Sequence, residues 1–447
     1  MEETVEKKKK VKLVPMIFLM YMFISGGSFG LEDMIGGAGP GISLIILIVL
    51  PIICAYPYGL VCTELGAKYP EVDGMYGWIK KALGRFPAYI SGWSISLANY
   101  VDTAVYMVIA MEYLNTAFKL NLNETQRWIM GIAFIVVICL LSIRGIEVLA
   151  LSATISGIIL LVPFILTIIM GIPQMVENPC IPIFGSGNAI MDTNTALMIG
   201  FWLFMGYESL HSFSGEVEGS GPLLTKAFLY AVPLATFIYI VPTFVGLAVV
   251  GNWQDWSAAG PIDFVELGRL VGGNFLMILF VIAGVFGNLS VFASYMSFGS
   301  VVTSQLAEDG LFFPGLEKEH PKYGTPYRAI IASGVISIVL SQGSFADLII
   351  IDVLLLLFPI IMIMISAIVL RIREAKGKTW NCFQFGKNKV FFCIAASAPI
   401  IIAAYAMATA GIQSLLASGA CWVIGIVMHF VFPKINKKKN NREEQVK

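Results

Sequence analysis

Several acidic residues lie within apolar stretches that are long enough to cross a bilayer: Glu32, Asp33, Glu64, Asp102, Glu208, Glu216 and Asp352. A carboxylate at membrane depth costs about 2.5–3.5 kcal/mol, so each is a candidate for binding a cation, an ammonium group or a proton. No lysine or arginine lies deep in the same stretches. Either several carboxyls are protonated, or a mobile cation or a cationic substrate supplies the missing charge.

The position of each acid along its apolar stretch indicates how strong a candidate for a functional role it is. Glu64 and Glu216 fall near the ends of their segments, where a solvated or helix-capping carboxylate is the simpler interpretation. Asp352 lies a few residues into its segment, and a structural and a functional role are equally compatible with that position. Glu208 is the strongest candidate because it follows a glycine in the middle of an apolar run, and Asp102 comes next.

Asp102 belongs to a polar stripe. Asn99, Asp102, Tyr106 and Tyr113 fall at i, i+3, i+7 and i+14, which places them on one face of a helix. A polar stripe on a membrane helix should face a cavity or the bundle interior. The alternative is a structural hydrogen bond from Asp102 to a neighbouring helix.

Two apolar segments are interrupted by glycine. The first reads "ISGGSFGLEDMIGGAGPG" over residues 24–41, and the adjacent Gly26 and Gly27 allow the helix to unwind. Close packing of another helix on these glycines is the alternative. The adjacent Glu32 and Asp33 point about 100° apart on a helix, so at least one should be structural or face the outer vestibule.

The second interrupted segment, "FWLFMGYESLHSFSGEVEGSG", carries Gly206 in mid-run. Interrupted helices at corresponding positions of two halves are typical of transporters built from inverted repeats. In such sites half-helix N-termini bind an anionic group, while unwound carbonyls bind a cation or an ammonium group. The two ends of an amino acid match both features.

The remaining elements follow from composition. The chain of 447 residues is 57% hydrophobic and only 13% charged, about half the charged fraction of soluble domains. We expect an all-α membrane protein, because a span must satisfy its backbone groups internally. Twelve spans are expected: 13–36, 41–66, 86–118, 126–144, 149–172, 194–218, 223–250, 272–305, 327–343, 347–371, 389–410 and 412–432.

Basic residues predict the orientation. Of the 29 lysines and arginines, all but Lys119, Arg127 and Arg269 fall on one side of these spans, which predicts cytoplasmic N- and C-termini. The lysine-rich tails are interpreted as topology signals that contact anionic lipid headgroups. The seven cysteines show no disulfide framework or metal-ligand spacing, and the net charge of zero indicates no nucleic-acid partner.

At these motifs the sequence resembles the amino acid–polyamine–organocation (APC) transporter superfamily, and most closely its polyamine-uptake and L-amino-acid-type permeases. The resemblance rests on "SGGSFGLEDMIGGAGP", "CTELGAKYPEVDGMYGWIKKALG", "YVDTAVYMVIAMEYL", "GYESLHSFSGEVE" and "LAEDGLFFPGLEKEHPKYGTP". It implies a LeuT-type 5+5 inverted repeat with broken helices 1 and 6. The expected organisation is a cytoplasmic tail (1–12), a ten-helix core (13–371), a cytoplasmic loop with two peripheral helices (372–432) and a second tail (433–447).

The resemblance also implies a substrate site. The N–H groups of Gly26 and Gly27, with Ser28 beside them, would hold a substrate carboxylate, and the carbonyls of Phe23, Trp202 and Met205 would receive its amino group. Trp202 and Tyr295 correspond to gating aromatic residues. Asn99, Thr103 and Tyr106 correspond to side-chain-pocket positions; Asp102 and Glu208 complete the candidate set.

The chain departs from the family pattern at two places. Many proton-coupled members carry a lysine in helix 5, where this chain has Pro163 and no lysine, which favours exchange or another coupling device. The loop "KLNLNE" lacks the cysteine by which heterodimeric relatives bind a heavy chain, so no disulfide-linked partner is expected.

We therefore expect a secondary active transporter of the plasma membrane that moves zwitterionic or cationic amines by alternating access, through exchange or proton or ion coupling. A polyamine- or diamine-specific transporter is the alternative. No cofactor is expected. An enzyme is disfavoured because the chain has no HExxH, phosphate loop or metal cluster. A channel or a sensor on the same fold is a remote alternative, since no pore motif and no long tail are present.

Overall fold

The computed structural model describes residues 11–69, 74–118, 120–206, 209, 220–257, 260–343, 345–374, 383–386 and 388–446. Within these ranges the named elements are all helical. The helices are α1 (Leu13–Ile24), α2 (Leu31–Ala38), α3 (Pro40–Leu50), α4 (Tyr56–Lys68), α5 (Gly74–Leu83), α6 (Arg85–Phe118), α7 (Glu124–Ser142), α8 (Ile146–Gly171), α9 (Ala189–Leu203), α10 (Ser220–Val250), α11 (Phe264–Glu308), α12 (Tyr327–Leu340), α13 (Phe345–Arg373), α14 (Lys389–Thr409) and α15 (Ile412–Val446).

Several helix ends follow from local sequence. Asn123 caps α7 in a capping box with Gln126, and the side chains of Asn188 and Asp263 cap α9 and α11. Pro40 starts α3, where its missing N–H costs nothing. A π-helical turn, Pro51–Ala55, joins α3 to α4, and 3₁₀ turns occupy Ile172–Gln174 and Trp253–Asp255.

Among the described residues, nine helical segments are long and apolar enough to cross a membrane. Joined through the π-helical turn, α3 and α4 form one of them, while α1 and α12 are shorter apolar helices. The expected all-helical membrane architecture is confirmed at this level. The total of twelve spans and the inverted repeat stay predictions.

The first expected span is broken at its glycines. Helix α1 ends at Ile24, α2 begins at Leu31, and between them Gly27 and Gly30 have φ values of 102° and 88°. A positive φ is inexpensive for glycine alone, which explains why this sequence unwinds here. Helix α1 runs from the periphery, where Val14 is exposed, into the core, where residues 19–24 are buried.

The sixth expected span is also interrupted. Helix α9 ends at Leu203, and Gly206 follows with a φ of 108°. Glu208, Glu216 and most of the segment up to α10 lie outside the described residues.

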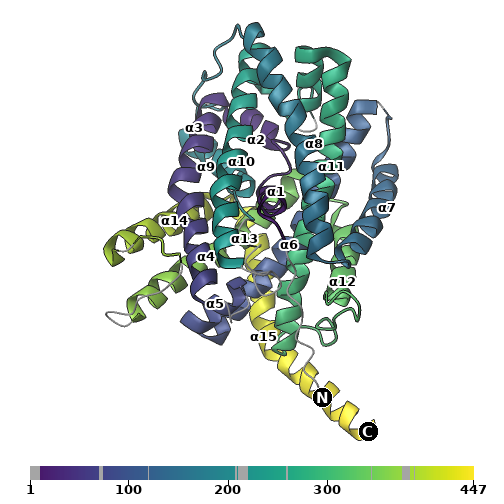
Figure 1. Cartoon of the computed structure of the whole chain (residues 1–447), viewed down its shortest axis with the longest axis vertical. Coiled ribbons are helices and arrows are strands. Elements are labelled where there is room, and N and C mark those ends of the chain that lie inside the picture. Colours follow the sequence, from purple (N-terminus) through teal and green to yellow (C-terminus); the bar gives the residue numbers. More distant parts are fainter. Residues whose placement is uncertain are drawn as a thin grey trace.

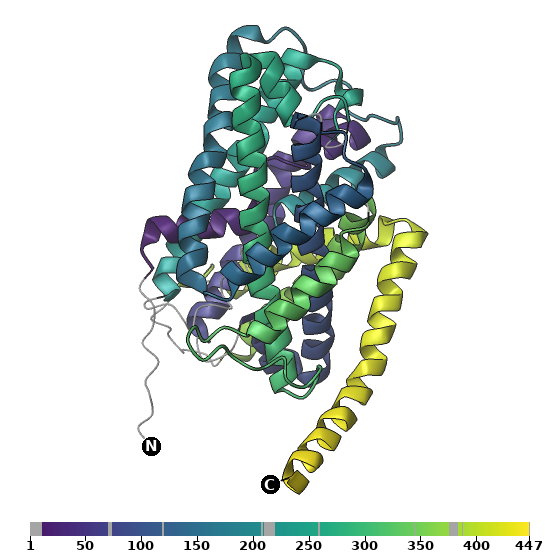
Figure 2. The ribbon, with the colours of Figure 1, turned by 90° about the vertical axis from the view of Figure 1, so that its right-hand side faces the viewer.

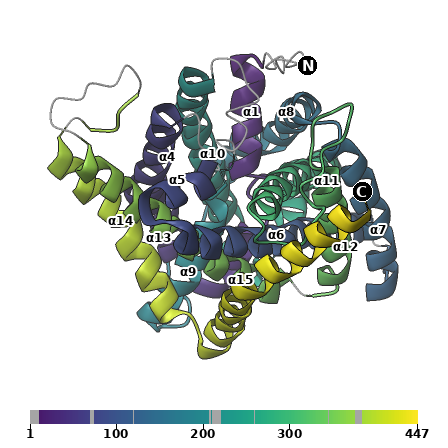
Figure 3. The same ribbon diagram turned by 90° about the horizontal axis from the view of Figure 1, so that it is seen from below.

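The long helices surround the first break. Helix α1 packs against α8, α10 and α11, and α6 packs along both α11 and α13. Figure 1 places α1 in the middle of the bundle, and Figure 2 shows it crossing the upright long helices at a steep angle. Helix α14 lies at the rim in Figure 3, and α15 runs along the outside of the bundle in Figure 2; most of their described apolar stretches are not buried.

Three features differ from the sequence-based expectations. The span expected at 272–305 extends from Phe264 to Glu308 and kinks at Gly272 and Gly273. The segment after α4 forms the helix α5, which packs against α6 and α13.

The third difference concerns Glu64, for which a solvated or capping role was the simpler interpretation. Glu64 is only 3% exposed, and it forms ion pairs of 2.6 Å with Lys68 and with Arg371 of α13. The solvated interpretation was wrong because these two basic residues, each at the end of its own helix, enclose the carboxylate. Glu64 therefore has a structural role.

Candidate functional site

The two helix breaks meet at the centre of the molecule. A Cβ added at Gly206 would lie 2.1 Å from the carbonyl oxygen of Phe23 and 2.2 Å from the Tyr295 hydroxyl. Only glycine allows this approach, and the positive φ of Gly206 adds a second requirement for glycine. The unwound ends of α1 and α9 are thus in direct contact.

Two tyrosine hydroxyls bridge these ends. Tyr239 of α10 lies within hydrogen-bond distance of the carbonyls of Ile24 (3.1 Å) and Leu203 (2.8 Å). Tyr295 of α11 does the same for the carbonyls of Phe23 (3.1 Å) and Met205 (3.4 Å). Because a helix end leaves its last carbonyls without intrahelical partners, these oxygens need donors. In this conformation hydroxyl groups supply them.

An aromatic cluster of Phe23, Tyr106, Trp202 and Tyr295 surrounds the junction. The rings of Tyr106 and Trp202 stack at 5.6 Å with 24° between their planes. Tyr295 lies 5.6 Å from Tyr106 and 5.8 Å from Phe23. All four residues are buried. Stacked ring faces carry partial negative charge and attract cations.

Two buried acids adjoin the aromatic cluster. The indole Nε1–H of Trp202 donates to Asp102 Oδ1 at 3.1 Å, and Asp102 is 1% exposed. Asp352 of α13 is completely buried, and its charge interacts with that of Asp102. Two acidic side chains, one from α6 and one from α13, therefore belong to the buried surroundings of the junction.

Gly26, Gly27 and Ser28 of the first break contact other groups than the aromatic cluster. The N–H of Gly27 donates to Ser25 Oγ at 3.0 Å, and the Ser28 hydroxyl donates to the carbonyl of Ile238 on α10 at 2.8 Å. Gly26 packs against α11, since a Cβ there would lie 3.1 Å from Val291. In this conformation Ser28 faces α10 and lies apart from the aromatic cluster.

The adjacent acids of the first span both have structural contacts. The Glu32 carboxylate accepts the N–H of Gly30 at 2.7 Å and the N–H of Phe264, the first residue of α11, at 3.1 Å. Asp33 accepts the hydroxyl of Ser257 at 2.6 Å. Glu32 therefore places a carboxylate at the N-terminus of α2, the kind of position that a substrate anion could otherwise occupy.

The candidate residues on α6, the polar stripe and Thr103, divide between two environments. Asp102 and Tyr106 reach the aromatic cluster. The Thr103 hydroxyl instead pairs with Ser337 of α12 at 2.7 Å, and the side chain of Asn99 lies against Gly299 of α11. The side chain of Tyr113 lies outside the described set.

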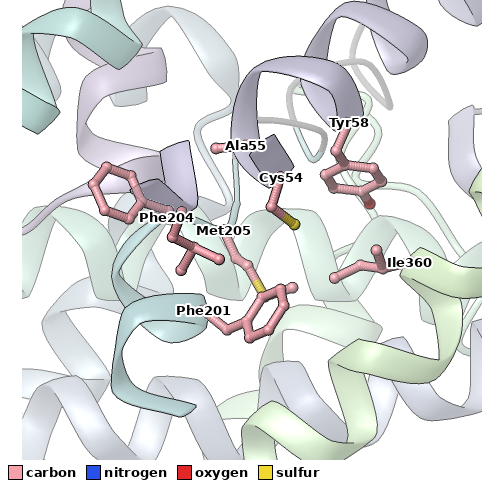
Figure 4. Close-up of a pocket in the computed structure, with 8 residues that line it drawn as sticks. Cys54, Ala55, Tyr58, Phe201, Phe204, Met205 and Ile360 are labelled. Carbon is pink, nitrogen blue, oxygen red and sulfur yellow. The ribbon is translucent and has the colours of Figure 1, made fainter. Parts of the chain in front are cut away.

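A small pocket lies beside the second break, between the π-helical turn and α13. Leu50, Cys54, Ala55, Tyr58, Phe201, Phe204, Met205 and Ile360 line it. Figure 4 shows Cys54 and Tyr58 on one side of the gap, with Phe201, Met205 and Ile360 on the other. It has room for about one water molecule.

The structure thus gathers Phe23, Asp102, Tyr106, Trp202, Met205 and Tyr295 around one point. Sequence reasoning missed Tyr239, because a tyrosine in an apolar helix carries no signal of its own. The sequence-based prediction named Asp352 as an acid within a span but did not include it in the candidate site. Asp102 and Asp352, two acids within different spans, could together have indicated a shared site.

Comparison with known proteins identifies relatives that are membrane transporters. A family model described as amino acid permease matches residues 16–433. The chain is 27% identical to the polyamine transporter RMV1 of Arabidopsis thaliana over 97% of this chain and 88% of the relative. It is 28% identical to the polyamine transporter PUT1 of Oryza sativa subsp. japonica, over 96% and 80%. It is 23% identical to an arginine/ornithine antiporter of Latilactobacillus sakei, over 74% and 72%.

Proposed function

The chain belongs to the amino acid permease family of membrane transporters, and from this we propose that it moves amino acids or related amines across the plasma membrane by alternating access. Its transport would be secondary active, through exchange or through coupling to protons or ions. The site of binding would be the junction of the two helix breaks.

The observation that carries this proposal is the convergence of acceptor groups on one point. The carbonyls of Phe23 and Met205, the carboxylate of Asp102 and the faces of Tyr106 and Trp202 lie around the junction. An ammonium group is a donor without acceptor capacity, so it suits such surroundings. In our proposal the substrate's ammonium group replaces the Tyr295 hydroxyl at these carbonyls.

A transporter restricted to polyamines or diamines is a narrower candidate. It is supported by the two buried acids, and by Glu32, which already supplies a carboxylate at the N-terminus of α2. Two of the relatives are named polyamine transporters. A substrate carboxylate would instead need the N–H groups near Gly26 and Gly27, where Ser28 now faces α10.

The membrane arrangement belongs to the same proposal. Twelve spans arise if α1 with α2, α9 with the segment that follows it, and α12 cross together with the nine long segments. Both termini would then be cytoplasmic, and the two breaks would belong to corresponding helices of an inverted repeat.

Uptake into proteoliposomes tests the function. Purified protein should take up a labelled amino acid, putrescine or spermidine in a saturable way, and preloading with unlabelled substrate should accelerate uptake if the protein is an exchanger. Trp202→Ala should abolish uptake, since it removes the ring stacked on Tyr106 and the donor to Asp102.

Cys421→Ala is the control, because only the backbone carbonyl of Cys421 takes part in the contact with Trp93. Absence of saturable flux across a broad panel of amino acids and polyamines would overturn the proposal.

A further inference from the structure

Asp352 is the most unusual polar side chain in the described core. It lies on α13, it is completely buried, and neither carboxylate oxygen has a hydrogen-bond partner among the described residues. Burying a carboxylate without partners is expensive. A group in this situation requires either a proton or a ligand that supplies hydrogen-bond donors and positive charge.

The surroundings of Asp352 connect it to the candidate site. Helix α13 packs along α6, which carries Asp102 and Tyr106. The carboxyl of Asp352 lies within electrostatic range of Asp102 and of Tyr106. Asp352 therefore lies on a helix that packs against the one carrying Asp102 and Tyr106, near the aromatic cluster.

The two acids differ in how they are satisfied. Asp102 accepts the indole N–H of Trp202, whereas Asp352 has no such donor in the described structure. Two interacting buried carboxylates cannot both be ionised at low cost unless a cation lies near them. A ligand with one ammonium group would compensate one acid, and a ligand with two would compensate both.

We propose that Asp352 is a substrate-binding residue that forms, with Asp102, a two-carboxylate site for the ammonium groups of a diamine or polyamine. The proposal rests on the proposed transport function and narrows its substrate class. Tyr106 lies one helical turn after Asp102 on α6, so its ring offers a face for the cationic chain between the two ends.

The test compares two ligands that differ by one charge. Inhibition of labelled putrescine uptake by unlabelled putrescine and by butylamine is measured in proteoliposomes. The wild-type protein should prefer putrescine. Asp352→Asn should raise the inhibition constant for putrescine at least about tenfold, the usual loss for a hydrogen bond to a charged group. The constant for butylamine should change little.

Two further variants separate charge from packing. Asp352→Glu keeps the charge and should retain part of the preference for putrescine. Asp192→Asn is the matched control, because Asp192 is equally buried but pairs with Ser186. It should leave the preference unchanged. Each variant is first shown to be folded by its thermal midpoint and its size-exclusion profile.

The outcomes are distinguishable. If the wild-type protein transports no amine, the proposed function fails. If it transports putrescine and Asp352→Asn has wild-type constants, the function stands and the role of Asp352 is overturned. The role is also overturned if Asn and Glu cause the same loss, or if Asn alters only the pH dependence of uptake, which would identify Asp352 as a proton site.

Discussion

At the scale of single residues, the hydroxyls of Tyr239 and Tyr295 determine how the broken helices are held. Each hydroxyl serves carbonyls from both breaks, and each comes from a helix that is itself continuous at that point. Continuous helices thus position the unwound segments. The same carbonyls would be available to a substrate ammonium once a hydroxyl moves away.

Tyr239→Phe should destabilise the protein by about 1–3 kcal/mol, because it leaves the carbonyls of Ile24 and Leu203 without this donor. The control is Tyr230→Phe on the same helix, since the side chain of Tyr230 is 60% exposed. Thermal midpoints of the two purified variants measure the difference. Equal midpoints would show that the Tyr239 hydroxyl contributes nothing to holding the breaks.

At the scale of elements, the unwound segments depend on glycine for contact as well as for conformation. Gly206 approaches Phe23 so closely that no side chain fits, and Gly287 of α11 makes a similar approach to the carbonyl of Gly26. Because these positions are glycine, the backbones of the two breaks and of α11 can approach one another closely.

Gly206→Ala should therefore strongly reduce both thermal stability and amine uptake, because its methyl group would overlap the Phe23 carbonyl and its φ of 108° is strained for alanine. Gly419→Ala on α15 is the matched control, since a Cβ there meets nothing within 4 Å. Wild-type uptake by the Gly206 variant would contradict the observed contact between the breaks.

The start of α11 gives a second prediction at this scale. Asp263 caps the helix by accepting the N–H of Glu266 at 2.7 Å, and its other oxygen has no partner among the described residues. Burial raises the pKa of Asp263 to about 6; the Glu266 charge adds to the rise, while backbone hydrogen bonds oppose it.

Because this pKa is higher in the folded state, the stability that Asp263 contributes is fully present below about pH 4. It is lost as the pH rises to about 6. Asp263→Asn keeps an oxygen for the cap and removes the titration. The wild-type protein should lose roughly 2 kcal/mol of stability relative to this variant between pH 4 and pH 7. Parallel stability curves from pH 4 to 7 would refute the assignment.

At the scale of the whole molecule, ionic contacts join distant segments at the helix ends. Glu64 pairs with Arg371 across 307 residues, and it also accepts the backbone N–H of Phe385. A second set joins α5 to the end of α11, where Asp309 pairs with Lys80 and Tyr76. These contacts hold α4 against α13 and α5 against the end of α11.

The proposed orientation can be tested with Cys180, which is exposed in the connection between α8 and α9. If both termini are cytoplasmic, this connection faces outward. A membrane-impermeant maleimide should then label intact cells that express the protein, and Cys180→Ser should abolish that labelling. Labelling that appears only after permeabilisation would reverse the orientation.

The sequence by itself determined the features that depend on local chemistry. Apolar length predicted the helical segments, because a span must satisfy its own backbone groups. Adjacent glycines predicted the break after Ile24, because glycine alone tolerates a positive φ without strain. The helix period placed Asp102 and Tyr106 on one face, and both reach the aromatic cluster.

Only the tertiary structure decided which groups meet. The partners of Ser28 and Thr103 lie on α10 and α12, so packing turned these two side chains away from the cluster. Asp352 comes within electrostatic range of Asp102 because α13 packs along α6, a contact between segments far apart in the chain. Charge and spacing in one segment cannot specify such pairs, since packing between helices sets them.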